Sequence, residues 1–307
     1  MIREQNIQTL SSDIAAIGKK FPGIDRFEQE VAKMQLKKLS NEEYYQAHKA
    51  LFSRTNQHAM MIEAGLRYAD EVVGSKAECS VLSIGCGYGL FDEPFLRQLS
   101  LKTKKLHFVG VDRNEAECVI VEKKCHAIAP ECSPKHKFAW QIYPIDFVNF
   151  ESCQRFNIIL LVHVCYYFPN LEYKIRKAYE LLNERGKLII MNNPLEEFKA
   201  PSSCIMKQLG EIDYWYSEDI QLVLNQCQLS FKQERIGASL NITECFNPDS
   251  DLGKKVLNFI VSVKVEYFSS LQLQLLLEYL REISSKKPDG EIIVSYPVDV
   301  FCIKKGG

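Results

Sequence analysis

Residues 81–90 of the chain read VLSIGCGYGL, in which an apolar run leads directly into three alternating glycines, Gly85, Gly87 and Gly89. A helical pattern of residues follows the last glycine. Glycine lets the backbone approach a ligand closely, and the N–H groups at the start of a helix can hold a negatively charged group. The stretch therefore predicts a strand, a ligand-binding loop and a helix; the alternative is a tight strand-to-helix turn that binds nothing.

Further apolar, partly β-branched runs alternate with helical stretches along the chain. The runs are CSVLSIG, LHFVGVD, KFAWQI, FNIILLVH and KLIIMN. Strands that alternate with helices form a parallel sheet with crossover helices, so the expected fold class is α/β. Towards the C-terminus we expect a strand near residues 231–241, helices near 252–263 and 271–283, and a final strand VDVFCIK that completes the sheet.

The second run ends at Asp112, where an acidic side chain can accept hydrogen bonds from two ribose hydroxyls. Alternatively, Asp112 caps the helix that begins at Asn114. The glycines have the spacing GxGxG, which is typical of S-adenosylmethionine enzymes, whereas nicotinamide enzymes ordinarily show GxGxxG. The loop also lacks the lysine and hydroxyl residue of a P-loop, which argues against a nucleotide triphosphatase.

Composition limits the class of protein. The chain has 307 residues, of which 46% are hydrophobic and 25% charged, as in a soluble globular protein with one catalytic unit. A formal net charge of -1 argues against nucleic acid as the main partner. The longest apolar run, FNIILLVHVCYYF, is too short to span a bilayer. We therefore expect a cytoplasmic protein with no membrane helix, and the sequence gives no prediction of oligomeric state.

Eleven cysteines are scattered through the chain without CxxC pairs, so we expect them to be reduced. Cys118, Cys125 and Cys132 recur every seven residues, with His126 and His136 nearby, and this spacing raises the possibility of a metal site. Zinc sites usually present close pairs of ligands, whereas a seven-residue spacing marks one face of a helix. We expect no metal.

The expected organisation has four consecutive parts. Residues 1–75 form a helical N-terminal cap, with a break near Ser53, and residues 76–193 form the cofactor-binding core. Residues 194–230 form an insertion that faces the substrate, in which Ser217 is the expected N-cap of a helix. Residues 231–307 complete the sheet.

Five segments of the chain carry a resemblance to a known family. They are LSIGCGYG, KFAWQ, HVCYYF, YSEDIQLVLNQCQL and LNITECF. The chain resembles class I S-adenosylmethionine-dependent methyltransferases, and within them most closely the histamine N-methyltransferase-like group, from about Asn41 onward. The resemblance implies a Rossmann-like, seven-stranded methyltransferase sheet with a helical N-terminal cap, and S-adenosyl-L-methionine as cofactor.

The resemblance also assigns cofactor-binding positions around the loop, the ribose and the adenine. They are Gly85, Cys86, Gly87, Tyr88, Gly89, Asp112, Glu117, Ile145, Asp146 and Val162. The acidic residue that usually stands two positions before the first glycine is replaced by Ser83.

Substrate-side positions come from the same resemblance and from two aromatic clusters, one at the end of the fourth strand and one in the insertion. His163 stands where the family keeps a glutamine at the end of the fourth strand, and it is the expected catalytic residue. The expected substrate-binding residues are Tyr44, Asn56, Tyr166, Tyr167, Tyr214, Trp215, Phe246 and Tyr296. Asn56 replaces a glutamate that grips the substrate in histamine-specific members, and Tyr296 replaces an asparagine. Both departures argue against histamine itself as the acceptor.

Methyl transfer from a sulfonium is an in-line displacement by a neutral nucleophile, and an aliphatic amine must lose a proton first. His163 can accept that proton, or it can simply end a buried strand as a hydrogen-bonded histidine. The tyrosines and Trp215 can form an aromatic cage for a cation, or pack in the core. We expect N-methylation of a small amine or imidazole; the alternatives are O- or C-methylation, methylation of a protein, and a binding protein without catalysis.

Overall fold

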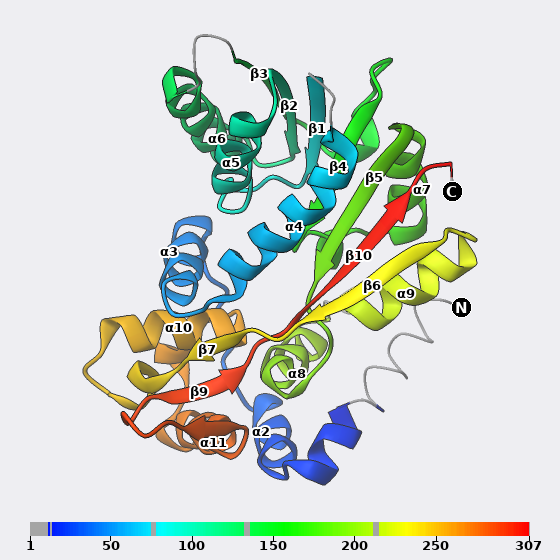
Figure 1. Ribbon diagram of the computed structural model, residues 1–307. Coiled ribbons are helices and arrows are strands. Elements are labelled where there is room, and N and C mark those ends of the chain that lie inside the picture. Colours follow the sequence, from blue (N-terminus) through cyan, green and yellow to red (C-terminus); the bar gives the residue numbers. More distant parts are fainter. Residues whose placement is uncertain (1–11, 13, 75–77, 132–135, 211–214, 307) are drawn as a thin grey trace. The chain divides into compact units, whose positions relative to one another are not determined.

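The computed structural model describes residues 12, 14–74, 78–131, 136–210 and 215–306 (Figure 1). The chain folds into two compact units. Unit 1 consists of Met1–Gln57, Pro194–Tyr214 and Gly237–Pro297, and unit 2 of His58–Asn193, Trp215–Ile236 and Val298–Gly307. The unit boundaries therefore fall inside three of the four parts expected from the sequence, 1–75, 194–230 and 231–307.

Unit 2 is built on a seven-stranded sheet with the order β3-β2-β1-β4-β5-β10-β6, which confirms the expected Rossmann-like architecture. Its strands are β1 (Glu78–Ile84), β2 (Lys105–Asp112), β3 (Lys137–Pro144), β4 (Phe156–Val162), β5 (Leu182–Asn192), β6 (Phe231–Ile236) and β10 (Val298–Lys304). The first five strands are parallel, and β10 runs antiparallel to both β5 and β6.

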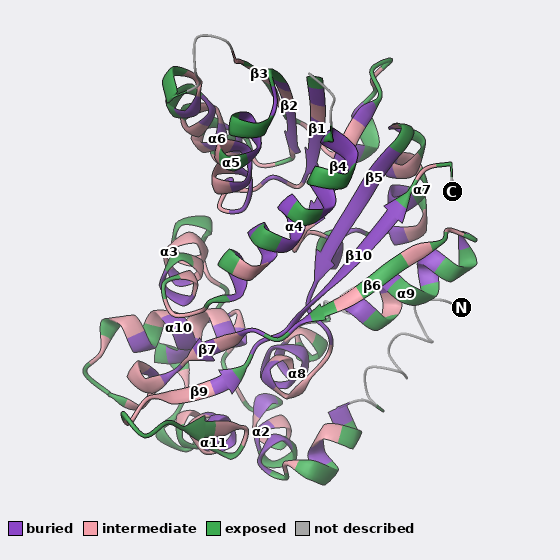
Figure 2. Ribbon diagram, in the orientation of Figure 1, coloured by how far each residue is buried: buried purple, intermediate pink, exposed green. Residues whose placement is uncertain are grey.

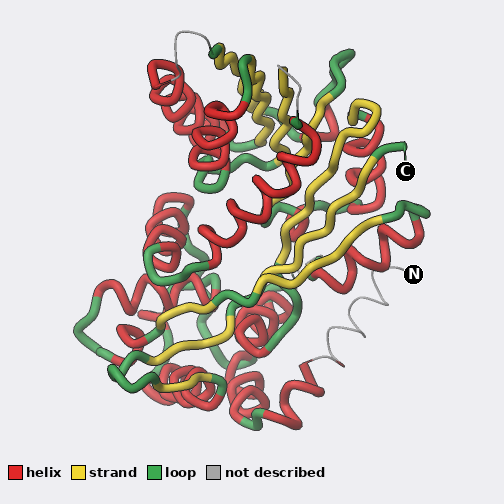
Figure 3. The backbone as a smooth tube through the Cα atoms, in the orientation of Figure 1, coloured by secondary structure: helices red, strands yellow, loops and turns green. Residues whose placement is uncertain are grey.

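Alternate residues of each strand point to opposite faces of the sheet, and helices cover both faces (Figures 2 and 3). Val81 of β1 packs with helices α4 (Gln57–Val73), α5 (Asp92–Lys102) and α6 (Glu115–Ile128). Its neighbour Leu82 packs with α7 (Leu171–Glu180) and α9 (Ser217–Gln226) on the other face. Because both faces are covered, β5 and β10 are buried along most of their length.

The position of a ligand site follows from the strand order. β1 pairs with β2 on one side and with β4 on the other, so the chain reverses its direction across the sheet at β1. In open sheets of this kind, ligands bind outside the carboxyl ends of the strands at such a reversal. The residues after Ile84, Asp112 and Val162 therefore meet at one edge of the sheet.

Unit 1 combines helices with a small antiparallel sheet around its own apolar core. Its helices are α2 (Gly23–Val31), α3 (Asn41–Phe52), α8 (Ala200–Gln208), α10 (Asp251–Val261) and α11 (Ser270–Glu282). Its strands are β7 (Ser239–Asn241), β8 (Ser284–Lys286) and β9 (Ile292–Ser295), in the order β7-β9-β8. The 3-10 helices of the two units are η1 (Ala129–Glu131), η2 (Phe147–Asn149), η3 (Cys165–Tyr167), η4 (Glu197–Lys199), η5 (Thr243–Phe246) and η6 (Val265–Tyr267).

Two expectations need correction. The strand expected over residues 231–241 is divided at Gly237, because β6 joins the large sheet and β7 joins the small one. Ser217 is the first residue of α9 and not its cap, because its hydroxyl donates to Asn192 O at 2.9 Å while Tyr216 occupies the cap position. The expected break near Ser53 is confirmed, since α3 ends at Phe52 and α4 begins at Gln57. Among the described helices, none is both long and apolar enough to cross a membrane.

Candidate active site

The glycine loop follows β1 and lies against the end of β4. Gly85 N donates to Val111 O at 2.7 Å, and Gly85 has a φ of 69°, which favours glycine. A Cβ atom on Gly85 would lie only 2.1 Å from Val164 Cγ2. A larger residue at position 85 would clash, because the loop packs directly on Val164.

Asp112 joins the loop to the helix after β2. Its Oδ2 accepts from Gly87 N at 2.9 Å, and its Oδ1 accepts from Asn114 N at 2.9 Å. The cap of α6 is Asn114, whose Oδ1 accepts from Ala116 N, and not Asp112. Each carboxylate oxygen can accept a second hydrogen bond, so Asp112 can fix the loop and still receive hydroxyl groups of a ligand.

Glu117 lies over the same loop. Its Oε2 would be 3.2 Å from a Cβ atom on Gly87, and its Oε1 accepts from Asn114 Nδ2 at 2.7 Å. Burial, and after it the charge of Asp112, raises the pKa of Glu117 to about 7. Two neighbouring carboxyl groups of this kind suit a ligand that offers hydroxyl donors, and the ribose of S-adenosylmethionine fits this requirement.

Asp92, at the start of α5, is a buried carboxyl group that the sequence did not single out. The Ser83 hydroxyl is its hydrogen-bond partner, whereas its Oδ1 has none among the described residues. Burial raises the pKa of Asp92 to about 6. The unsatisfied oxygen of this buried carboxyl group can receive a cationic group, and it lies beside Ser83, the position where the resemblance leads one to expect an acid.

Three further predicted cofactor residues lie after β3 and at the end of β4. Ile145 is partly buried against the core, and Val162 is partly accessible at the end of β4. The Oδ1 of Asp146 accepts from Val148 N at 2.8 Å and pairs with Lys174 Nζ. Asp146 is therefore fixed in place by a buried lysine.

His163 directly follows β4 and adopts an unusual backbone conformation for a non-glycine residue, with a φ of 50°. Its N–H donates to Met191 O at 2.9 Å. Its Nδ1 lies 3.2 Å from Tyr166 Oη, and the two rings are nearly parallel, at 9°. The strand end and the tyrosine together fix the orientation of the imidazole.

The hydrogen bonds of Tyr166 determine which nitrogen of His163 is basic. Tyr166 Oη donates its one proton to Asn193 Oδ1 at 2.9 Å, and it accepts from Asn193 N at 2.7 Å. With that proton on Asn193, Tyr166 Oη accepts from His163 Nδ1 in the tautomer that carries the proton on Nδ1. In the neutral imidazole, the lone pair then resides on Nε2.

The remaining aromatic residues of unit 2 differ in exposure. Tyr167 is 48% exposed and meets Tyr166 edge to face. Trp215 is only 7% exposed, and its Nε1 donates to Phe168 O at 2.7 Å, so its ring packs in the core beneath α7 and α9. Tyr214 lies outside the described residues.

Four predicted substrate residues belong to unit 1. Tyr44 packs against the rings of His48 and Phe259, at centroid distances of 6.1 and 5.6 Å. The Oδ1 of Asn56 accepts from Ser239 N at 2.8 Å. Phe246 lies under the guanidinium of Arg281 at 4.7 Å. Tyr296 meets Phe198 edge to face and lies beneath the ammonium of Lys199.

The cysteines that raised the possibility of a metal lie on α6. Cys118 and Cys125 are both buried, and Cys132 lies outside the described residues. Within the ranges that the structure describes, no three His, Cys, Asp or Glu side chains gather in a way that could hold a metal ion.

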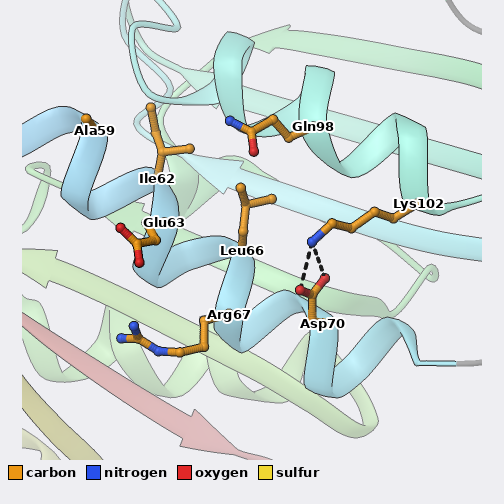
Figure 4. Close-up of a pocket in the computed structure, with 8 residues that line it drawn as sticks. All are labelled: Ala59, Ile62, Glu63, Leu66, Arg67, Asp70, Gln98 and Lys102. Carbon is orange, nitrogen blue, oxygen red and sulfur yellow. Dashed lines mark hydrogen bonds and ion pairs between the residues drawn. The ribbon is translucent and has the colours of Figure 1, made fainter.

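A groove of about 400 Å³ lies between α4 and α5 on unit 2 (Figure 4). In its lining, Lys102 pairs with Asp70, and Arg67 pairs with Glu234. Lys102 ends α5 just before β2 begins, whereas the glycine loop and Asp112 lie at the opposite edge of the sheet. The groove is therefore separate from the candidate site.

Comparison with known proteins gives one family and several similar proteins. The model of the family described as "Methyltransferase domain" matches residues 53–221. Histamine N-methyltransferase of Cavia porcellus is 21% identical over 231 residues, which cover 71% of this chain and 79% of that protein. Histamine N-methyltransferase of Bos taurus is 20% identical over 279 residues, which cover 85% of this chain and 95% of that protein.

Among solved structures, the N-methyltransferase NodS from Bradyrhizobium japonicum WM9, in complex with S-adenosyl-L-homocysteine, is similar with a TM-score of 0.41. It is 14% identical, and the match covers 80% of this chain and 87% of that one.

Proposed function

Because the chain belongs to the methyltransferase-domain family, as a class I enzyme that uses S-adenosylmethionine, we propose that it methylates a nitrogen of a small amine or imidazole. The observation that carries this proposal is the imidazole of His163. Its Nδ1 is held by Tyr166, and its Nε2 is the basic nitrogen. The next residue in the chain, Val164, packs against Gly85 of the glycine loop. A base at this position suits an acceptor that must lose a proton.

The residues present fit the cofactor. We infer that the glycine loop, with Cys86 and Tyr88, holds its methionine end, that Asp112 and Glu117 receive the ribose hydroxyls, and that Ile145, Asp146 and Val162 lie beside the adenine. Asp92 is the candidate partner for the ammonium group of the methionine part, because its Oδ1 has no other partner among the described residues. When bound, the cofactor supplies an electrophilic methyl group on sulfur.

His163 is the proposed base. Its Nε2 would accept a proton from the protonated acceptor nitrogen, which leaves that nitrogen with the lone pair it needs to take the methyl group that the bound cofactor would supply. Asn193 and Tyr166 keep the lone pair on Nε2 by holding the proton on Nδ1. They are positioning residues.

We further infer that Tyr166 and Tyr167 contribute to acceptor recognition. The positions of unit 1 that the resemblance assigns to the acceptor stay predictions; they are Tyr44, Asn56, Phe246 and Tyr296. Trp215 supports the fold of unit 2, because its ring is buried. Asn56 and Tyr296 stand where histamine-specific members carry other residues, so we propose an acceptor other than histamine. Nine of the ten described cysteines are buried, which is compatible with a reducing compartment, and we propose the cytoplasm.

The test is a methyl-transfer assay with an amine panel that includes histamine, L-histidine and aryl ethylamines. His163→Asn is the variant to compare, because asparagine tolerates the left-handed conformation of residue 163. We expect kcat to fall about 100-fold, with the Kd for S-adenosylmethionine changed less than about 3-fold. An unchanged kcat would rule out His163 as the base, and failure to methylate any panel member would remove the support for an amine acceptor.

A further inference from the structure

Lys174, on α7 in unit 2, is an almost completely buried lysine. Only 4% of its side chain is exposed, and its Nζ lies 2.5 Å from Oδ1 of Asp146. The same ammonium group lies 5.4 Å from the ring centroid of Phe168 and 5.7 Å from that of Phe147. Taking an ammonium group out of water is costly unless an opposite charge compensates it. Within the described ranges of the chain, Asp146 is its one carboxylate partner.

The carboxylate of Asp146 has one oxygen that is held and one that is open. Lys174 Nζ and Val148 N both donate to Oδ1, at 2.5 and 2.8 Å. Oδ2 accepts no hydrogen bond from any described residue, and 41% of the side chain is exposed. Burial by itself would raise the pKa of Asp146, but the hydrogen bonds from Lys174 and Val148 N outweigh it and lower the pKa. Asp146 is thus ionised at neutral pH, with Oδ2 available as an acceptor.

Asp146 lies close to the proposed ribose site within unit 2. In the ladder between β2 and β3, Asp112 is paired with Pro144, two residues before Asp146. Neighbouring strands of a sheet lie about 4.8 Å apart, so the residues that follow these two strand ends lie side by side. A ribose held by Asp112 would therefore bring its base towards Asp146. The base of S-adenosylmethionine is adenine, whose 6-amino group carries two N–H donors.

We propose that Lys174 is a positioning residue for cofactor selectivity: by holding Oδ1 of Asp146, it leaves Oδ2 to accept a hydrogen bond from the 6-amino group of adenine. This inference rests on the proposed cofactor site. A carboxylate at this position discriminates against a base with a carbonyl oxygen in place of the amino group, because two acceptors would then face each other. The buried ammonium group keeps the carboxylate in one orientation before the ligand arrives, which lowers the cost of ordering it on binding.

The experiment compares two ligands by isothermal titration, without turnover. They are S-adenosylhomocysteine and S-inosylhomocysteine, which has a carbonyl oxygen in place of the 6-amino group. We expect the native protein to bind the first at least about 10-fold more tightly, and Lys174→Met to reduce this preference below about 3-fold. Lys174→Arg keeps the charge and should restore part of the preference. Equal weakening of both ligands in Lys174→Met would indicate a merely structural role and overturn the inference.

Lys177, one turn further along α7, provides the matched control. Its Nζ donates to Val148 O at 2.8 Å and lies 5.2 Å from the ring centroid of Phe147, but it donates no hydrogen bond to Asp146. Lys177→Met should leave the preference between the two ligands unchanged. An equal loss of preference in the Lys174→Met and Lys177→Met variants would contradict a specific role of Lys174.

A double-mutant cycle tests whether Lys174 acts through Asp146. We expect Asp146→Ala to remove the preference, and the addition of Lys174→Met to change it no further. The double variant also contains no unpaired buried ammonium group, so it keeps the test valid if Asp146→Ala alone fails to fold. Urea unfolding establishes which variants are folded. A preference that survives in the double variant would show that the amino group is recognised elsewhere, and would overturn the inference.

This titration needs no methyl acceptor, so it separates the inference from the proposed function. Binding of S-adenosylhomocysteine with a preference that does not depend on Lys174 contradicts only the role of Lys174. A preference that does depend on Lys174, in a protein that methylates no amine, contradicts only the proposed amine acceptor. If the native protein binds neither ligand, the cofactor site and the role of Lys174 are both overturned.

Discussion

Glu117 and Asp112 place two carboxyl groups beside the glycine loop, where they receive the ribose hydroxyls in our proposal. Glu117 has a raised pKa, about 7, so at pH 7 it is about half protonated in the free protein. Hydroxyl donors favour the ionised form of a carboxyl group, so a ribose bound there lowers its pKa again. Cofactor binding at pH 7 should therefore release up to about half a proton.

Isothermal titration in two buffers with different heats of ionisation measures this release. We expect Glu117→Gln to abolish it.

Without ligand, the raised pKa of Glu117 lowers the stability of the folded protein as pH rises from about 4.5 to about 7, because the folded state holds the proton more tightly. The free energy of unfolding of Glu117→Gln, measured in urea, should thus exceed that of the native protein by about 1 kcal/mol at pH 8 and be equal to it at pH 4. The figure allows for the partial exposure of this side chain. A stabilisation at pH 4 alone would contradict this explanation.

Tyr166 carries a prediction about stability. Its buried hydroxyl makes two hydrogen bonds with Asn193, so Tyr166→Phe removes both of them from buried groups. We expect the free energy of unfolding in urea to fall by about 1–3 kcal/mol. Tyr143→Phe is the matched control, because the Tyr143 hydroxyl bonds only the exposed side chain of Gln141, and its loss should cost less than about 0.5 kcal/mol. Equal effects in the two variants would show that the Tyr166 network contributes no stability.

At the level of single residues, the sequence predicts those whose role depends on local spacing. The alternating glycines and Asp112 are recognisable because they are tied to the ends of two strands. Asp92 is not, because its hydrogen bond to Ser83 is a contact that only the fold creates. Buried acids and lysines have no signature in sequence spacing.

Among the elements, the turn from β1 into α5 is the most constrained. Gly85→Ala would place a methyl group against Val164 in a backbone conformation that favours glycine, so we expect it to lower the free energy of unfolding by at least about 2 kcal/mol. Gly237→Ala is the control, since nothing lies within 4 Å of the added atom. Val164→Ala in the Gly85→Ala background should restore part of the loss. Similar stability of the two single alanine variants would contradict the packing described here.

The large elements of unit 2 could be predicted because their apolar runs are long and bounded. β4 and β10 each bury nearly every residue, which produces an uninterrupted apolar run in the sequence. The small sheet of unit 1 could not be predicted. β8 has three residues, all at least partly accessible, and β7 follows β6 after only two residues, so the pair resembles one strand. Its pairing with β9, about fifty residues away in the chain, leaves no local pattern.

At the scale of the whole molecule, the chain has two units with separate apolar cores, so we expect the cofactor to stabilise the unit that binds it. Every proposed cofactor-binding residue lies in unit 2. A ligand at 100 times its Kd stabilises the form that binds it by about 2.7 kcal/mol. In hydrogen-exchange mass spectrometry with S-adenosylmethionine, we expect increased protection in β1, β2 and the start of α6. The three-stranded sheet of unit 1 serves as the comparison, and protection confined to that sheet would contradict the assignment.

The most direct test of the central claim is isothermal titration of the purified protein and of Asp112→Ala with S-adenosylmethionine and S-adenosylhomocysteine, after urea unfolding has shown that the variant is folded. Our account predicts binding of both ligands to the native protein with a Kd on the order of micromolar, and at least about 10-fold weaker binding to the variant. If neither ligand binds, or if the loss of the Asp112 carboxylate leaves both affinities unchanged, the cofactor site is not the one described here.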